Sequence, residues 1–153
     1  MRRERHMSSE FNEAEESPGF MLWQVTNLWQ KAIRNALEPF ELTHPQFVLL
    51  FSCKWLNEHN DHTGITQVQL AQHAQMDVNV TSQVLRTLEK KGYIERRPHP
   101  TDSRANIISV TKAGDAAASQ AVKAVETEDR AFFSGLGHEI KDMNRLLRQL
   151  ARR

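Results

Sequence analysis

Hydrophobic residues recur every three or four positions over most of the chain, which is typical of helices that bury one face. The first such run covers residues 18–40. It is preceded by Ser17, a candidate N-cap, and starts with Pro18 at the first helical position. Further apolar side chains widen this run: Phe20, Met21, Trp23 and Leu28. We therefore expect the first helix to contact more than its own domain's core.

Two more helices are predicted by a pair of capping boxes, in which a threonine is followed three positions later by a glutamine. The boxes are Thr43 with Gln46 and Thr66 with Gln69. The first opens a helix over about residues 43–57, and the second opens a short helix over residues 67–74. The polar stretch NEHNDHTG between them has the composition of a loop.

A fourth helix is predicted after Asp77, which can serve as its N-cap. The residues spaced to face inward are Val80, Val84, Leu85 and Leu88. Gly92 can take the left-handed conformation that ends a helix, and Tyr93 then stands where such an ending places an apolar partner for Leu88. The glycine favours a helix here over a strand.

The next segments, YIERR and NIISVT, contain β-branched residues and predict an antiparallel pair of strands around residues 98–105. Thr111 then caps a long alanine-rich helix, which is interrupted at Gly135 and Gly137. A last helix places Met143, Leu146, Leu147 and Leu150 on one stripe. The order of elements predicts a mainly α fold with a small two- or three-stranded antiparallel wing, that is, a winged helix-turn-helix.

The composition limits the kind of protein. With 153 residues, 39% of them hydrophobic and 25% charged, the chain is long enough for one domain with a core. Its single cysteine excludes an intrachain disulfide framework and a four-cysteine zinc site. No apolar run has the length of a membrane span or the character of a secretory signal. We therefore expect a cytoplasmic protein with no membrane partner.

Basic residues concentrate in one window, residues 86–104, although the net charge is only +1. The outer side of the fourth helix has no carboxylate between Asp77 and Glu89. Its side chains can bond or touch base edges, and the candidates for base readout are Val78, Asn79, Ser82, Gln83 and Arg86. An ordinary solvated helix face usually mixes glutamate with lysine, so this composition favours readout of double-stranded DNA.

Several segments match one known family in the same order. They are LTHPQFVLL, then TQVQLAQHAQMDVNVTSQVLRTLEKKGYIERRPHP, then Asp102-Ser103-Arg104 followed by ISVTKAG. This pattern resembles the MarR family of bacterial transcriptional regulators, whose wing signature is Asp-x-Arg and a strand ending in Leu-Thr-x-x-Gly; here Val110 replaces the leucine. The resemblance covers about residues 18–150. It implies a repressor that acts as a homodimer on a pseudo-palindromic operator and uses no cofactor.

The predicted wing can reach the minor groove beside the recognition helix, where an arginine is attracted to the negative potential. We expect Arg104 to make this contact and Asp102 to hold its guanidinium, as the resemblance also implies; a plain surface salt bridge is the alternative. Residues flanking the readout face are expected to contact phosphates, and these are Thr66, Gln67, Lys90, Lys91, Arg96 and Arg97.

The chain divides into parts with different expected roles. Residues 1–17 lack apolar periodicity and predict a flexible tail. By resemblance, residues 18–40 and 112–153 form dimerisation helices, and residues 41–111 form the DNA-binding lobe. The candidate dimer contacts are Phe20, Leu22, Val25, Leu136, Ile140, Met143, Leu146, Leu147 and Leu150.

A small aromatic or phenolic effector is also implied, since many members of the family bind one between the dimerisation helices and the lobe. Aromatic residues that could line such a crevice are Trp23, Trp29, Phe47, Phe51 and Trp55. Aromatic residues at helical spacing more often belong to a core, so a purely structural role stays open for all five.

Other functions receive less support. Cys53 lies in an apolar segment and is expected to be buried and inert, which makes a redox-responsive regulator the weaker interpretation. The run from Glu58 to His62 has metal-capable side chains, but a solvated loop is simpler, so no metal is predicted. No nucleophile elbow, phosphate loop or HExxH helix occurs, which disfavours an enzyme. A winged helix that docks a protein instead of DNA stays open, and salt dependence distinguishes the two.

Overall fold

The computed structural model describes residues 9–61 and 63–152 and is mainly helical. The α-helices are α1 (Pro18–Leu37), α2 (His44–His59), α3 (Gln67–Ala74), α4 (Val78–Lys90), α5 (Lys112–Phe133) and α6 (Ile140–Ala151). Short 3-10 segments are η1 (Ala14–Glu16), η2 (Glu38–Phe40) and η3 (Ser134–Glu139). The strands β1 (Ile65–Thr66), β2 (Ile94–Pro98) and β3 (Asn106–Val110) form an antiparallel sheet in the order β1-β3-β2. The predicted fold class is confirmed, with a three-stranded wing.

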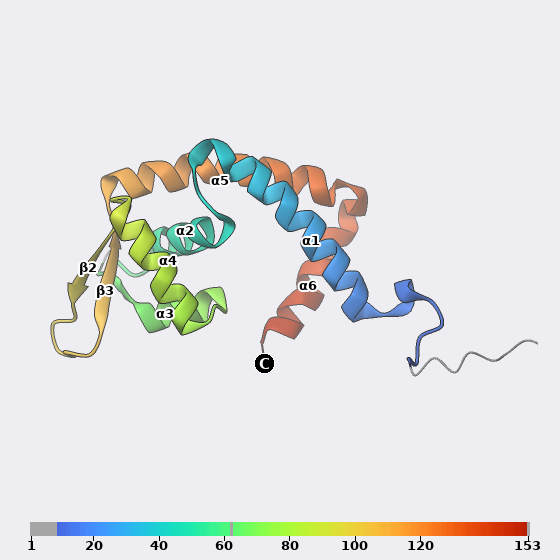
Figure 1. Ribbon diagram of the computed structural model, residues 1–153, viewed down its shortest axis with the longest axis horizontal. Helices are drawn as coiled ribbons and strands as arrows, with labels where there is room; N and C mark the ends of the chain where they lie inside the picture. Colours follow the sequence, from blue (N-terminus) through green and yellow to red (C-terminus); the bar gives the residue numbers. More distant parts are fainter. Residues whose placement is uncertain (1–8, 62, 153) are drawn as a thin grey trace, which may run out of the picture.

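Helix α5 connects two parts of the molecule (Figure 1). One part, here called the lobe, runs from α2 to β3 and lies under one end of α5. The other part, here called the arm, consists of α6 and the N-terminal half of α1, which extend away from the opposite end of α5 (Figure 1). The predicted tail falls partly outside the described residues, and within residues 9–17 the segment η1 forms a single turn before α1.

The predicted helix starts are confirmed. The Ser17 side chain accepts a hydrogen bond from the backbone N–H of Phe20 at 3.2 Å. Both capping boxes are present with their two reciprocal hydrogen bonds: Thr43 with Gln46, and Thr66 with Gln69. Helix α1 ends at Leu37, before the predicted end, because Pro39 has no N–H to continue an α-helix and the chain passes into the 3-10 turn η2.

The hydrophobic core is centred on α2 within the lobe. Fully buried or nearly fully buried side chains from the lobe are Leu49, Leu50, Cys53, Leu70, Leu85, Leu88, Ile94 and Ile108. The C-terminal end of α1 contributes Ile33 and Leu37, and α5 contributes Ala118 and Ala121. Because these two helices share the lobe's core, the position of α5 is fixed relative to α4 and the wing.

The inward face of α4 differs from the predicted one. Val80 is 45% exposed, whereas Thr81 is completely buried together with Leu85 and Leu88. The Thr81 hydroxyl donates a hydrogen bond to the Asp77 carbonyl at 2.8 Å, so its polar group is satisfied inside the core. The predicted placement of Val80 is therefore wrong, because hydropathy alone ranks valine above threonine for burial and misses this bond.

The end of α4 positions the wing. Gly92 adopts φ +77°, and the backbone N–H groups of Gly92 and Tyr93 donate to the carbonyls of Glu89 and Leu88, each at 3.0 Å. This is the predicted left-handed helix ending. A Cβ at Gly114, in the first turn of α5, would lie 2.0 Å from the Tyr93 carbonyl oxygen, so the glycine allows α5 to approach the start of β2.

Helix α6 carries the predicted apolar stripe, but none of its residues is buried. Leu146, Leu147 and Leu150 are each between 44% and 56% exposed. Gly137 interrupts η3 with φ +54° and ψ −126°, a conformation that favours glycine, and the chain turns there from α5 toward α6. In residues 9–61 and 63–152, no helix has both the length and the apolar character required to cross a membrane.

Candidate nucleic-acid interface

The outer face of α4 carries the predicted base-reading side chains toward solvent. Val78, Asn79, Gln83 and Arg86 are exposed, and Ser82 is half-buried. At the start of the helix, the Asp77 carboxylate accepts the N–H groups of Asn79 at 2.8 Å and Val80 at 3.2 Å. The Arg86 guanidinium donates to the Ser82 hydroxyl at 3.3 Å, which orients it along the outer face. The face therefore presents amide, hydroxyl and guanidinium groups together, as base readout requires.

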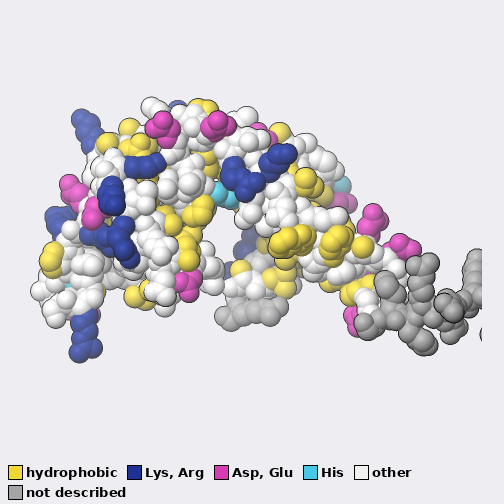
Figure 2. All heavy atoms as spheres, in the orientation of Figure 1, with side chains coloured by type: hydrophobic (Ala, Val, Ile, Leu, Met, Phe, Trp, Pro, Cys, Tyr) yellow, Lys and Arg dark blue, Asp and Glu magenta, His cyan; other side chains and the backbone are white. Residues whose placement is uncertain are grey.

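The electrostatic setting of α4 is cationic. Figure 2 shows Lys and Arg side chains gathered over α4 and the wing, whereas hydrophobic side chains are prominent on the surface of α1. Along α4, no acidic residue occurs between its N-cap Asp77 and Glu89. Glu89 itself pairs with Arg96 of β2, with Oε2 3.2 Å from Nε. A phosphate approaching the first three turns of α4 therefore meets no carboxylate beyond the N-cap.

The wing is an antiparallel pair, β2 and β3, joined by residues 99–105. Arg104 is exposed in this loop. The Asp102 carboxylate accepts the backbone N–H of Arg104 at 3.0 Å. We predicted that Asp102 would hold the guanidinium, but among the described residues the ion pairs do not include these two side chains. Asp102 thus fixes the backbone at Arg104 and leaves the long side chain free to reach outward.

The wing tip lies beside the N-terminus of α3. Together they line an open groove of about 410 Å³, formed by Thr66, Gln67, Val68, Asp102, Arg104, Ala105 and Asn106. Pairing of β1 with β3, Thr66 opposite Ile107, brings the two segments together. The structure therefore unites Thr66 and Gln67 with Arg104, three residues that the sequence analysis assigned to DNA contacts separately.

The other basic residues have different surroundings. Lys90 is exposed, and Arg96 is half-buried in its pair with Glu89. The Lys91 ammonium bonds to the backbone carbonyl of Glu41, which draws it toward the loop before α2. Arg97 donates to the Ser109 hydroxyl at 3.4 Å, on the wing face that also borders a small polar cavity with Lys54 and Asp115. Lys91 and Arg97 are therefore drawn to other partners, whereas Lys90 lies on α4 and Arg96 stays beside it through Glu89.

The five aromatic residues proposed to line an effector crevice are not brought together. Phe47 and Phe51 stack on each other, with centroids 5.8 Å apart, and Phe47 belongs to the core. Trp23 is 67% exposed on α1. Trp55 stacks on His59 and His73 at the far end of α2. Of the five, Trp29 alone borders the larger cavities next to α1.

A cavity of about 470 Å³ lies between α1, the start of α2 and the end of α3. Its lining residues are Trp29, Gln30, Arg34, Thr43, His44, Pro45, Val48, Ala74 and Met76. The Trp29 indole N–H donates to the Asp129 carboxylate at 2.8 Å, and the His44 ring meets the Trp29 ring edge-on at 5.0 Å. Burial lowers the pKa of His44; Asp129 opposes this shift and Arg34 adds to it. Sequence reasoning missed Arg34 and His44, because neither forms part of an aromatic pattern.

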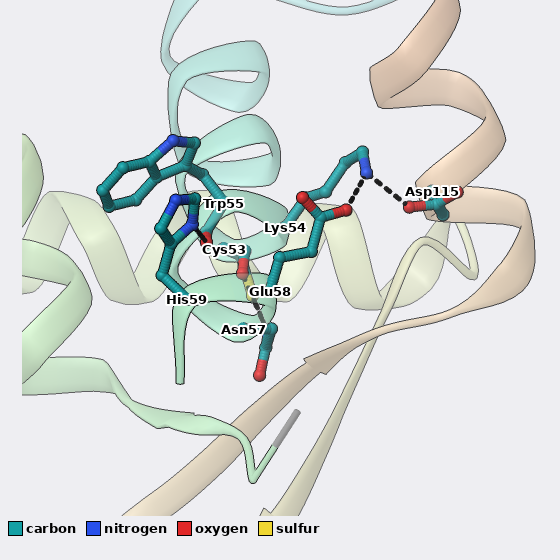
Figure 3. A network of polar contacts seen from close by, with 7 residues as sticks. All are labelled: Cys53, Lys54, Trp55, Asn57, Glu58, His59 and Asp115. Atoms are coloured by element: carbon teal, nitrogen blue, oxygen red, sulfur yellow. Dashed lines mark hydrogen bonds and ion pairs between the residues drawn. The ribbon is translucent and has the colours of Figure 1, made fainter. Parts of the chain in front are cut away.

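Cys53 is fully buried, as predicted. Burial raises the pKa of its thiol to about 12, and the Asn57 amide donates to the Cys53 carbonyl at 2.9 Å (Figure 3). The thiol is therefore protonated at neutral pH and is a poor target for peroxide.

The metal-capable loop is engaged in other contacts. Glu58 pairs with Lys54, which also reaches Asp115 at 3.0 Å (Figure 3). His59 packs on Trp55 with centroids 3.8 Å apart, and its Nδ1 bonds to the Trp55 carbonyl at 2.7 Å (Figure 3). His62 lies outside the described residues. In the part of the chain that the structure describes, no three metal-ligating side chains cluster.

Comparison with known proteins agrees with this architecture. The model of the MarR family matches residues 42–105. A helix-turn-helix transcriptional regulator of uncharacterised role, YdcH of Bacillus subtilis, is 45% identical over 126 residues, which are 82% of this chain and 84% of YdcH. The chain belongs to the MarR family. Members of this family are transcriptional regulators and not enzymes, so this protein is a MarR-family helix-turn-helix regulator of transcription.

Solved structures of MarR-family proteins share the fold. A mutant MarR from Escherichia coli in complex with operator DNA superposes with a TM-score of 0.78 at 24% identity, covering 92% of this chain and 99% of that one. CouR from Rhodococcus jostii RHA1, bound to p-coumaroyl-CoA, superposes with a TM-score of 0.80 at 22% identity, covering 93% of this chain and 96% of that one. At these identities the likeness establishes the MarR fold.

Proposed function

We propose that this MarR-family regulator is a repressor that binds a pseudo-palindromic operator as a homodimer. The observation that carries the proposal is the joint exposure of the α4 face and of Arg104, with the groove at the N-terminus of α3 beside the wing tip. A recognition helix in the major groove and an arginine in the neighbouring minor groove need these two elements to project from one lobe. The complex of E. coli MarR with operator DNA supports such a role for the fold.

Each group has a distinct role in this proposal. Asn79, Gln83 and Arg86 read base edges by hydrogen bonds, Ser82 supports Arg86, and Val78 touches a thymine methyl. Arg104 enters the minor groove, while Asp102 fixes the loop backbone. Phosphate contacts come from the first turn of α3, Thr66 and Gln67, and from the basic residues Lys90, Lys91, Arg96 and Arg97. Lys91 and Arg97 contribute least, since their hydrogen bonds draw them away from the α4 face.

The arm supports the homodimer. Its exposed apolar residues are Phe20, Leu22, Val25, Leu146, Leu147 and Leu150, with Ile140 and Met143 half-buried among them. Leu136, in the preceding segment η3, is exposed beside the arm. A mostly apolar cavity of about 460 Å³ lies between α1, α5 and α6. Surface of this kind is covered in a stable protein, and pairing of the arms would set two lobes on half-sites about one helical turn apart.

A small aromatic anion is the effector class that fits the cavity next to Trp29. Trp29 offers an aromatic wall, and Arg34 and His44 offer donors for a carboxylate or phenolate. CouR, which shares the fold, binds p-coumaroyl-CoA. Because the cavity lies between α1 and the lobe, a ligand there would change the spacing of the two reading heads and release the operator. We place this activity in the cytoplasm, where operator DNA is accessible.

Two other functions make different predictions. A winged helix that docks a protein partner would bind with little dependence on salt, whereas operator binding that neutralises about six to ten phosphates weakens by orders of magnitude from low to moderate salt. A redox-responsive regulator acting through Cys53 is disfavoured by the burial of the thiol and its raised pKa.

The decisive experiment is selection of bound fragments from random double-stranded DNA, followed by titration of the selected fragment at two salt concentrations. The proposal expects a two-fold-related consensus and steep salt dependence. Arg104→Ala should weaken binding by about tenfold to a hundredfold while the dimer persists. Failure to enrich any sequence, or salt-insensitive binding, would contradict the proposal.

A further inference from the structure

The wing loop, residues 99–105, is ordered by polar contacts. Every side chain from Pro100 to Arg104 is exposed, so burial of apolar groups does not hold the tip. Instead, the backbone N–H of His99 donates to the Ala105 carbonyl at 3.1 Å, and the N–H of Ala105 donates to the Asp102 carbonyl at 3.2 Å. These two bonds close the base of the loop. The apex of the loop must therefore be held by hydrogen bonds of its own.

The His99 side chain supplies that hold. Its Nδ1 accepts the backbone N–H groups of Thr101 and Asp102, each at 3.1 Å, and lies 3.3 Å from the Thr101 hydroxyl. A backbone N–H can only donate, so Nδ1 must carry a lone pair and the ring proton must be on Nε2. His99 itself stands between Pro98 and Pro100, which restrict its backbone, and its ring is half-buried.

The hydrogen bonds continue from His99 to Arg104. The neutral imidazole fixes the backbone at Thr101 and Asp102, and the Asp102 carboxylate then accepts the N–H of Arg104 at 3.0 Å. We propose that His99 is a positioning residue for operator binding, whose neutral imidazole holds the wing tip so that Arg104 is presented, and whose protonation releases the tip. This inference rests on the proposed operator binding.

Protonation should release the tip because an imidazolium carries N–H groups on both nitrogens and cannot accept a hydrogen bond. Two backbone N–H dipoles would then face a cation. The charged residues of the segments around His99 are Asp102 and Arg104 within the loop and Glu95, Arg96 and Arg97 on β2; β3 and the first turn of α3 carry none. Simple electrostatics gives the opposite sign, since an added positive charge at the wing strengthens attraction to phosphate. A loss of operator affinity at lower pH therefore indicates release of the wing tip, and a gain indicates simple attraction to phosphate.

The test compares His99→Ala with His99→Asn in the full-length protein, on the operator fragment selected with the wild type. The Oδ1 of asparagine can take the place of Nδ1 and accept the same two N–H groups, but it does not titrate. At about pH 8, His99→Ala should lose about tenfold in operator affinity, as expected when about two loop hydrogen bonds are lost, and His99→Asn should stay within about twofold of the wild type.

The pH dependence of operator affinity separates this role from a purely structural one, which would not make affinity depend on the protonation of His99. As the pH is lowered, wild-type affinity should fall relative to that of His99→Asn, because only the histidine side chain can take up a proton. In an Arg104→Ala background, His99→Ala should cause little further loss, because its effect passes through Arg104. Equal affinity of His99→Ala and wild type, or identical pH profiles for wild type and His99→Asn, would overturn the inference.

A measurement without DNA separates this inference from the proposed function. In the free protein, nitrogen chemical shifts of the His99 ring should report the Nε2–H form at about pH 8, and the amides of Thr101 and Asp102 should be protected until the ring is protonated. An Nδ1–H ring or unprotected amides at about pH 8 would refute the positioning role even if operator binding is found. If instead the ring and amides behave as expected but no DNA is selected, the proposed function fails and the description of the loop stands.

Discussion

The lobe and the arm of this MarR-family protein bury their apolar residues in different ways. In the lobe, Leu49, Leu50, Leu85 and Leu88 are completely buried within one chain. In the arm, Leu147 and Leu150 occupy an equally regular helical stripe yet stay 44% and 56% exposed. The same helical spacing of leucines thus corresponds to a buried core in the lobe and to an exposed apolar surface in the arm. The lobe, together with the buried ends of α1 and α5, encloses its apolar residues, whereas the stripe on α6 is left uncovered. In the proposed homodimer, a second copy would cover this stripe.

The largest expected effect comes from truncating one leucine in each region. Leu85→Ala should lower the free energy of unfolding by about 2–5 kcal/mol, because it leaves a cavity in a closed core. Leu147→Ala, the matched change in the arm, should act only through the dimer, so its effect should vanish on dilution. Urea unfolding followed at several protein concentrations measures both. A large, concentration-independent loss in Leu147→Ala would show that the arm has its own core.

A charge in the arm tests the assembly. Leu147→Glu combined with Leu150→Glu should convert the dimer to a monomer and lower operator affinity about a hundredfold, since two linked lobes bind far more tightly than one. Gln149→Glu adds a carboxylate off the stripe of the same helix and serves as control. Sedimentation gives the mass and a DNA titration gives the affinity. If the double variant still sediments as a dimer, α6 is not part of the dimer interface.

The junction between lobe and arm should respond to pH through His44. Its pKa is lowered chiefly by burial, so the unfolded chain binds more protons than the folded one between the lowered value and the ordinary histidine value. Neutral His44 therefore costs no stability above the ordinary histidine pKa. As the pH falls toward the lowered pKa of His44, the free energy of unfolding decreases. His44→Gln should therefore flatten the acid limb of thermal stability slightly. Superimposable curves of Tm against pH for the two proteins would contradict this assignment.

The smallest expected effect is that of peroxide. Because burial raises the pKa of Cys53 to about 12, the reactive thiolate is scarce at neutral pH. Operator affinity should stay unchanged after treatment, as it should in a Cys53→Ser variant that retains the fold. A loss of affinity in wild type that the serine variant does not show would establish a redox switch.

Most of the fold could be predicted from local signals, because those signals involve contacts within a few residues. The Thr66–Gln69 box, the Asp77 cap and the Gly92 ending each depend on neighbours two to five positions away, and all three are present. Thr81 could not be placed in the core from hydropathy, since a single hydrogen bond to Asp77 makes its burial acceptable.

The candidate site was predictable only in part. The exposure of Asn79 and Gln83 follows from helical geometry, so the outer face of α4 could be predicted. The surroundings of Lys91 and Trp55 could not, because they depend on segments distant in sequence: the loop at Glu41 and the ring of His73. The partners of long or aromatic side chains are set by tertiary packing. The local spacing of residues in the sequence does not reveal that packing.

A hydroxyl-radical footprint of wild type and of Arg104→Ala on the selected operator would show whether two lobes and two wings contact the DNA. Operator binding as proposed predicts two symmetric half-sites about 10 base pairs apart, centre to centre, each with a protected minor-groove edge that the variant loses while the rest of its backbone protection remains. A single asymmetric footprint, or minor-groove protection that is the same in both proteins, would contradict it.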